Sequence, residues 1–303
     1  MALANPRVVY GLLMRAAAET LLEVAADPKH LGAEVGVLAV LHTWGQNLTL
    51  HPHVHCVVTG GGLSLDGSQW VAGRDDFFLP VRVLSRVFRG KFLSGLRSAF
   101  KRGRPRFPGE LAPLSRSDRF NALLSEVVRT EWVVYAQAPF GAGAETVLKY
   151  LARYTHKAAI SNHRLVDLAD GRVSFRWKDY AHGGRQGIMT LDSVEFVRRF
   201  LMHVLPSGFV RVRHYGLLAN RHRQEKLARC RELIGKAEAP QADTAPTDAD
   251  PVKPPVHETT VTPTRVCPRC GSGRVVVVAE FPPLPSAKGT RAGLAPCLTW
   301  DSS

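Results

Sequence analysis

The sequence predicts an α+β protein with a central antiparallel sheet and flanking helices. Two apolar runs, 34–43 and 53–59, have the length of buried strands and are separated by a link short enough for antiparallel pairing. The segment 164–177 reads as a β-hairpin, because Asp170-Gly171 is a dipeptide typical of a tight turn between two strands. Helical periodicity is predicted for the following segments: 6–27, 81–102, 117–129, 145–156, 192–204 and 220–236.

The remaining elements and the domain limits follow from apolar runs and changes in composition. Further strands are predicted at 132–139 and 186–191, a short extended segment at 209–216, and a turn at the glycines 60–62. We expect three parts: a catalytic domain over 1–236, a disordered linker over 237–264, and a small C-terminal cysteine-knuckle tail over 265–303. The linker holds six prolines and almost no large apolar residues, so it cannot build a core.

Composition favours a polyanionic partner. The chain has 303 residues, 45% of them hydrophobic, which is enough for a substantial core. Its formal net charge is +14 and its pI is about 10.0, so DNA, RNA or an anionic surface is the expected partner. We expect no membrane span and no signal peptide, and therefore a cytoplasmic protein. Five cysteines are too few and too scattered for a disulfide framework.

The segment HPHVHCVVTGG, residues 51–61, predicts part of a metal site. Side chains two apart on a strand point to the same face, so His53 and His55 lie side by side. Neutral imidazoles bind divalent ions, and such an ion can polarise a scissile phosphate. His51 has the same parity and is a further candidate ligand, although Pro52 disturbs the strand; Gln46 is another, brought near by the link.

The segment KYLARYTHK, residues 149–157, predicts a pair of nucleophiles. Tyr150 and Tyr154 are four apart in a helical pattern and therefore project from one face. A phenol can attack phosphorus when a metal or a cationic group favours the phenolate. Aromatic residues at this spacing more often form a packed face, but here they stand in a basic helix.

Two basic segments predict phosphate contacts. Residues 82–106 contain nine Lys/Arg and no acidic residue, and residues 198–236 contain ten Lys/Arg against two Glu. The candidate DNA-binding residues are basic residues of these two segments and of the segment that contains the two tyrosines: Arg82, Arg86, Arg89, Lys91, Arg97, Lys101, Arg102, Lys149, Arg153, Lys157, Arg211, Arg213, Arg221 and Arg223.

The C-terminal tail contains half of a zinc knuckle. Cys267 and Cys270 have the two-residue spacing of such a knuckle and are followed by glycine. A second pair is missing, and only Cys297 and His257 could complete the set. The sequence therefore predicts an incomplete Zn²⁺ site.

The histidine and tyrosine motifs together resemble a known family. The stretches 42–64, 150–165, 173–184 and 209–235 closely resemble rolling-circle transposases of the insertion-sequence 91 family, which belong to the HUH superfamily of the two-tyrosine type. The resemblance covers nearly all of residues 5–281. It implies an HUH-endonuclease-like sheet, Mg²⁺ or Mn²⁺ as cofactor, and cleavage of single-stranded DNA at element ends through a 5′-phosphotyrosine.

Carried over residue by residue, the resemblance makes His53 and His55 metal ligands and Tyr150 and Tyr154 the nucleophiles. Family members begin with a cysteine-rich region and a further strand before the position of Asn5, which implies an N-terminally truncated chain with an exposed sheet edge along 34–43. Two other functions stay open: a truncated remnant or regulator that only binds nucleic acid, and a zinc hydrolase that uses His51 with the same two histidines.

Overall fold

The chain forms two compact units, Met1–Pro240 with Ser302–Ser303, and Gln241–Asp301. A computed structural model describes the following residues: 1–74, 78–137, 147, 151–152, 159–179, 183–238, 265–266 and 274–275. The second unit is described only by strands β8 (Arg265–Val266) and β9 (Arg274–Val275), which pair antiparallel. The predicted linker and the cysteine tail otherwise lie outside the described residues.

A four-stranded antiparallel sheet is the centre of the first unit. Its order is β3 (Trp70–Ala72), β2 (Leu50–Ser64), β1 (Ala33–Trp44) and β7 (Val212–Gly216). The predicted runs 34–43 and 53–59 lie within β1 and β2, and their antiparallel pairing is confirmed. The sheet joins segments far apart in the sequence, because β7 returns to pair with β1.

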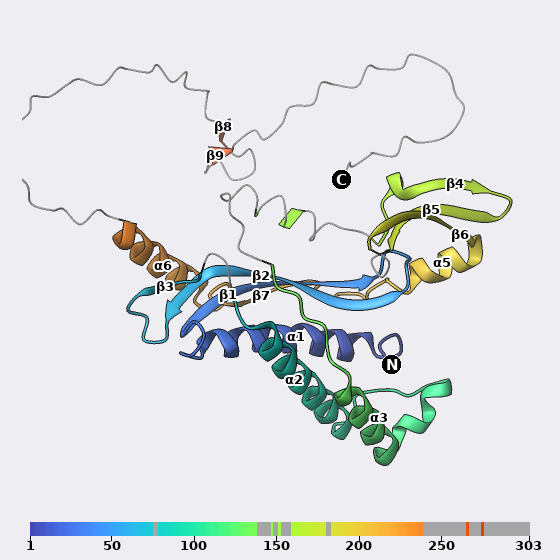
Figure 1. The fold of residues 1–303 in the computed structure, drawn as a ribbon, viewed down its shortest axis with the longest axis horizontal. Helices are drawn as coiled ribbons and strands as arrows, with labels where there is room; N and C mark the ends of the chain where they lie inside the picture. The colour runs from blue at the N-terminus through green and yellow to red at the C-terminus, as the bar shows by residue number, and fades with distance from the viewer. Residues whose placement is uncertain are drawn as a thin grey trace, which may run out of the picture. The chain divides into compact units, whose positions relative to one another are not determined.

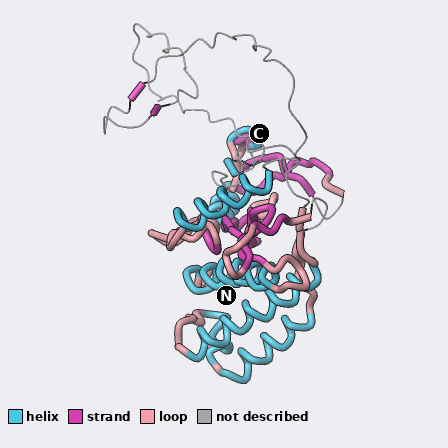
Figure 2. Tube along the Cα trace, turned by 90° about the vertical axis from the view of Figure 1, so that its left-hand side faces the viewer, coloured by secondary structure: helices cyan, strands magenta, loops and turns pink. Residues whose placement is uncertain are grey.

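Helices cover one face of this sheet (Figures 1 and 2). Helix α1 (Pro6–Ala26) packs on the sheet, and α2 (Val81–Lys101) packs on α1. Helix α3 (Ser117–Arg129), preceded by the 3₁₀ helix η1 (Gly109–Ser115), packs on α2 through Phe120 and Leu124. No helix in the described ranges has both the length and the apolar content that a bilayer crossing requires.

Strand alternation decides which side chains meet these helices. Ala39 and Leu41 of β1 pack against α1, as do Val54 and Cys56 of β2. Because successive side chains of a strand point to opposite faces, the residues between them face away from α1.

A second, three-stranded antiparallel sheet packs beside the turn between β1 and β2. It contains β4 (Leu165–Ala169), β5 (Arg172–Asp179) and β6 (Arg185–Asp192), with the short helix η2 (Asn162–Arg164) before it and α5 (Ser193–Leu201) after it. The predicted hairpin turn at Asp170-Gly171 is confirmed, and both residues have positive φ, 51° and 69°. Helix α6 (Arg223–Glu238) follows β7, and the Lys226 ammonium holds it to Glu34 of β1 at 2.6 Å.

Three expectations are wrong. The segment 132–137 is not a strand, and 138–139 lie outside the described residues. The Trp132 ring packs against Phe88 of α2, and the Trp132 carbonyl accepts a hydrogen bond from the Ser85 hydroxyl at 2.6 Å. The segment therefore runs over α2 instead of pairing with a strand.

The glycines 60–62 lie inside β2 instead of forming a turn. At this point β2 lies between β1 and β3, and the three backbones approach closely. A Cβ on Gly61 would lie 2.5 Å from the Val71 carbonyl oxygen, and one on Gly62 would lie 2.5 Å from that of Glu34. The glycine run is thus required by crowding in the sheet.

Strand β1 is not an edge. The expected exposed edge along 34–43 is absent, because β2 pairs with one side of β1 and β7 pairs with the other. The sequence predicts 209–216 as an extended segment but does not place it beside β1, since no local pattern specifies that Val212 pairs with Val40 or Gly216 with Gly36. The overall class is as predicted: α+β, with an antiparallel sheet flanked by helices.

Candidate metal centre on the central sheet

Three histidines meet on the sheet face that points away from α1. His42 lies on β1, and His53 and His55 lie on β2, with His42 and His53 directly opposite in the strand register. Leu41 and Val54 point toward α1, so alternation places the three imidazoles on the other face. The predicted side-by-side arrangement of His53 and His55 is present, with 4.9 Å between the ring centroids.

The spacing of the ring nitrogens fits one divalent ion. One nitrogen of each of the three histidines lies within 4.8 Å of the others. The Nε2 atoms of His53 and His55 are 3.1 Å apart. Two neighbouring ligands at about 2.1 Å from an octahedral ion are separated by roughly 3.0 Å, from the right angle between them. The donor set therefore fits a cation shared by the three rings.

A backbone contact orients His53 as a ligand. Its Nδ1 lies 2.7 Å from the carbonyl oxygen of His51, and a carbonyl can only accept, so Nδ1 carries the proton. In a neutral imidazole the other nitrogen then presents its lone pair, which here points toward His55. Proteins usually orient a metal-binding histidine in this way, by a hydrogen bond from its other ring nitrogen to a carbonyl oxygen.

His42 is the residue that sequence reasoning missed. His42 is 2% exposed, and the centroid of its ring lies 4.5 Å from that of His55 and 4.6 Å from that of Trp44, on which it stacks. The sequence does contain a signal for His42. It stands two residues before Trp44, so the two side chains share one face of β1, and the short link to β2 brings that face close to the other histidines. Choosing the register correctly would have placed His42 opposite His53.

The other two candidate ligands make backbone contacts instead. His51 is exposed, and its carbonyl holds His53. Gln46 lies in the turn between β1 and β2, where its carbonyl accepts a hydrogen bond from the Arg164 guanidinium. Their assignment as metal ligands stays a prediction.

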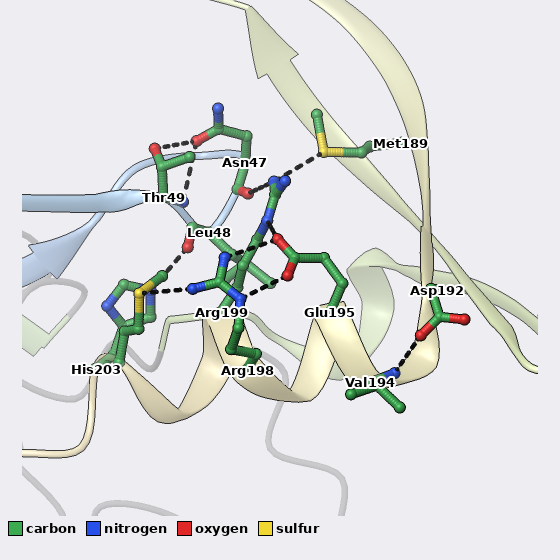
Figure 3. Close-up of polar contacts among 11 residues, drawn as sticks. Asn47, Leu48, Thr49, Met189, Asp192, Val194, Glu195, Arg198, Arg199 and His203 are labelled. Atoms are coloured by element: carbon green, nitrogen blue, oxygen red, sulfur yellow. Dashed lines mark hydrogen bonds and ion pairs between the residues drawn. The ribbon is translucent and has the colours of Figure 1, made fainter.

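Three side chains hold the turn that joins the two histidine strands: Arg164 of η2, Arg199 of α5, and His203, which follows α5. The carbonyls of Gln46, Asn47 and Leu48 are three consecutive acceptors. The Arg164 guanidinium donates to Gln46. Arg199 Nη1 lies 3.2 Å from the Asn47 carbonyl oxygen, and His203 Nε2 lies 3.1 Å from that of Leu48 (Figure 3). We call these donors the turn clamp. They fix the turn in position next to the histidine cluster.

Packing under the turn adds to this clamp. Leu48 has a positive φ of 61° and is fully buried, in a cluster with Phe175 and Ala159. A leucine rarely adopts this backbone conformation, so tertiary contacts must hold it there.

Burial and ion pairs fix the protonation states of the side chains in and around the turn clamp. Burial lowers the pKa of His203, whose Nδ1 also contacts the Thr43 hydroxyl at 3.2 Å, so the ring is neutral at pH 7. Arg198 and Arg199 donate hydrogen bonds to Glu195 and lower the pKa of its carboxyl to about 2. Glu195 thus stays ionised and aligns Arg199 toward the turn (Figure 3).

The candidate DNA-binding residues separate into different surfaces. Arg211 and Arg213 lie at β7, where the Arg213 guanidinium sits 5.1 Å from the centroid of the Phe209 ring. Arg221 and Arg223 are exposed at the start of α6. The seven candidates at α2 and its C-terminal end lie on the helical layer that faces away from the histidines: Arg82, Arg86, Arg89, Lys91, Arg97, Lys101 and Arg102.

Several predicted site residues lie outside the described residues. Among them are both candidate nucleophiles, Tyr150 and Tyr154; of their predicted helix the structure describes Val147, Leu151 and Ala152, all helical. The others are Lys149, Arg153, Lys157, Cys267 and Cys270.

The fold and the site define an α+β protein with a candidate three-histidine cation centre on the face of an antiparallel sheet that points away from α1. Residues 36–226 match the family model Y2_Tnp, described as "Putative transposase". The chain belongs to this transposase family, which confirms the resemblance to insertion-sequence 91 elements. DNA is the partner that this membership implies.

Two relatives support the assignment. The chain is 54% identical over 278 residues to "Putative transposase y4qJ" of Sinorhizobium fredii, covering 91% of this chain and 69% of the relative. It is 29% identical over 214 residues to "Transposase for insertion sequence element IS801" of Pseudomonas savastanoi pv. phaseolicola, covering 69% of this chain and 48% of the relative. No solved structure matches the chain.

Proposed function

We propose that this transposase cleaves and rejoins single-stranded DNA at element ends through a 5′-phosphotyrosine. The observation that carries the proposal is the histidine cluster His42, His53 and His55, positioned on the rigid central sheet of a chain from a transposase family. When bound, a divalent ion at these residues would polarise the scissile phosphate and neutralise developing charge. The basic surface supports binding of the phosphate backbone.

In the proposed reaction, the phenolate of Tyr150 or Tyr154 attacks phosphorus. A tyrosine O–P bond forms, the P–O3′ bond breaks, and the leaving oxygen takes a proton to become a free 3′-OH. Rejoining is the reverse: a 3′-OH attacks the phosphotyrosine and releases the phenol. The reaction conserves one phosphodiester at each step and therefore needs no ATP.

The donor set favours Mn²⁺ over Mg²⁺. Mg²⁺ prefers oxygen ligands and keeps its waters, whereas imidazole nitrogens suit transition ions better. Three imidazoles also suit Zn²⁺, as in a catalytic zinc site with one open position. A zinc hydrolase is therefore the second candidate, with His42 in the position for which His51 was predicted.

The test is to follow each end of a labelled single strand. We expect a 3′-labelled single-stranded DNA pool, incubated with the protein and Mn²⁺, to give a labelled protein band that survives denaturation. A 5′ label should remain on free DNA, because the tyrosine holds the 5′ end of the downstream fragment. Peptide mapping should place the adduct on residues 149–157.

The controls separate the alternatives. The double variant Tyr150→Phe/Tyr154→Phe should form no adduct, while Tyr135→Phe, which changes an exposed tyrosine, should form it normally. DNA binding without an adduct would favour the hypothesis that the chain is a remnant or regulator that only binds nucleic acid. Metal-dependent cleavage without an adduct would favour the zinc hydrolase, and a 5′-labelled adduct would overturn the proposed polarity.

A further inference from the structure

The outward face of α2 carries a row of exposed cations. Arg82, Arg86, Arg97 and Lys101 are exposed. At 100° per residue they fall within about 100° of arc, so they form one stripe. We call these four residues the α2 ridge. The helix contains no acidic residue, and none of the four side chains makes a hydrogen bond or ion pair with any residue in the described ranges.

The other cations of α2 behave differently. The Arg89 guanidinium donates to the Thr130 carbonyl at 3.0 Å, and the Lys91 ammonium pairs with Glu23 of α1 at 2.6 Å. These two side chains hold the helix in place. Among the described residues Arg89 and Lys91 have partners and the ridge has none, so the ridge presents its positive charge to an external anion.

The ridge lies on the side of the sheet opposite to the histidine cluster. Leu84 of α2 packs in one cluster with Val35 and Val37, whose side chains face the helical layer. His42 and His55 face the other way. In Figure 1, α1 and α2 lie together below the sheet. A strand bound at the histidines is thus separated from the ridge by the sheet and the helices.

The spacing within the ridge fits a duplex better than a single strand. Arg82 and Arg86 form one pair and Arg97 and Lys101 another, with pair centres 15 residues, or about 22 Å, apart. The exposed positions between them are the small, uncharged Gly90 and Ser94. The major groove of B-DNA is about 12 Å wide, so two pairs of long side chains can each reach one backbone across it. Beside the middle of the stripe a single strand would meet only Arg89, whose guanidinium is held by the Thr130 carbonyl.

We propose that the α2 ridge is a docking site for a duplex DNA segment, separate from the strand held at the histidines. The proposal rests on DNA being the partner of this chain, and not on the cleavage reaction. It gives the protein two nucleic-acid surfaces on opposite sides of one sheet. The transposase could then hold duplex DNA while a single strand is processed on the other face.

The test compares binding of duplex and single-stranded DNA by fluorescence anisotropy over a range of salt concentrations. In the variant Arg82→Gln/Arg86→Gln/Arg97→Gln/Lys101→Gln, loss of four phosphate contacts should make the slope of log K against log salt for a duplex shallower by about 3 to 4. Single-strand affinity should change much less. An unchanged duplex slope, or an equal loss for both DNAs, would overturn the proposal.

A pair of glycine variants controls for total charge and folding. Gly90 and Gly235 are exposed helical glycines, and a Cβ on either would meet nothing within 4 Å. Gly90→Glu places an acidic group in the middle of the ridge and should lower duplex affinity several-fold, whereas Gly235→Glu on α6 should not. Equal effects would show that only net charge matters. Running the adduct assay on the same proteins separates failure of the ridge from failure of catalysis.

Discussion

Replacing His203 by leucine tests how much the turn clamp contributes to stability. Leu48 is fully buried, and its carbonyl receives the His203 Nε2–H at 3.1 Å. A leucine at 203 leaves this carbonyl without its donor, which costs about 1–3 kcal/mol. The buried Thr43 hydroxyl loses a partner as well, so we expect the free energy of unfolding to fall by about 2–4 kcal/mol.

The same substitution should change the pH dependence of stability. Burial lowers the pKa of His203, so the unfolded chain binds the proton more readily than the folded protein. The contribution of His203 is therefore complete above its unfolded pKa of about 6.5 and decreases as the pH falls toward its folded pKa. The slope from this one group cannot exceed about 1.4 kcal/mol per pH unit. That part of the slope should vanish in His203→Leu.

Urea unfolding at about pH 7.5 and about pH 5.5, followed by tryptophan fluorescence and far-UV circular dichroism, measures both effects around the ordinary histidine pKa of about 6.5. His203→Gln is the matched control, because its amide can donate to the Leu48 carbonyl without titrating. It should recover part of the stability at the higher pH and show the reduced slope. A leucine variant as stable as the parent protein, with the same pH dependence, would refute the reasoning.

Two further predictions concern the metal centre and the sheet. His42→Ala should weaken Mn²⁺ binding by about 10–100-fold or more, measured by electron paramagnetic resonance without DNA. His51→Ala keeps the backbone carbonyl that holds His53 and should change Mn²⁺ binding much less. Equal losses in the two variants would place His51 among the ligands. Gly216→Ala should lower the free energy of unfolding in urea by about 3 kcal/mol or more, because Gly216 has φ 59° and a Cβ would overlap the Val35 carbonyl oxygen. Gly90→Ala adds a Cβ in open space on a helix and should raise the free energy of unfolding by about 0.5–1 kcal/mol. Similar effects of the two substitutions would contradict the argument that the backbone at Gly216 is crowded.

Local patterns were sufficient for most elements. The apolar runs at 34–43 and 53–59 became β1 and β2, and Asp170-Gly171 became the turn of the β4–β5 hairpin. Both depend on short-range physics: side-chain alternation along a strand, and the positive φ that this dipeptide adopts easily. The side-by-side placement of His53 and His55 follows from the same alternation.

Where local patterns failed, a distant contact had decided the outcome. The apolar segment at 132–137 has the composition of a strand, yet it contacts Ser85 and the aromatic rings of α2 instead of pairing with a strand. The glycines 60–62 have the composition of a turn, yet they lie inside β2, because β1 and β3 approach it too closely there for a Cβ on Gly61 or Gly62.

The sequence by itself therefore determined the fold class, the two histidines of one strand and the excess of positive charge, because each is a property of neighbouring residues or of composition. Only the tertiary structure decided that β7 closes the side of β1, that His42 completes the histidine cluster, and that the α2 ridge lies behind the sheet. These features depend on strand register and on which surfaces pack together. Register and packing are fixed by contacts between residues far apart in the chain, and no local pattern encodes them.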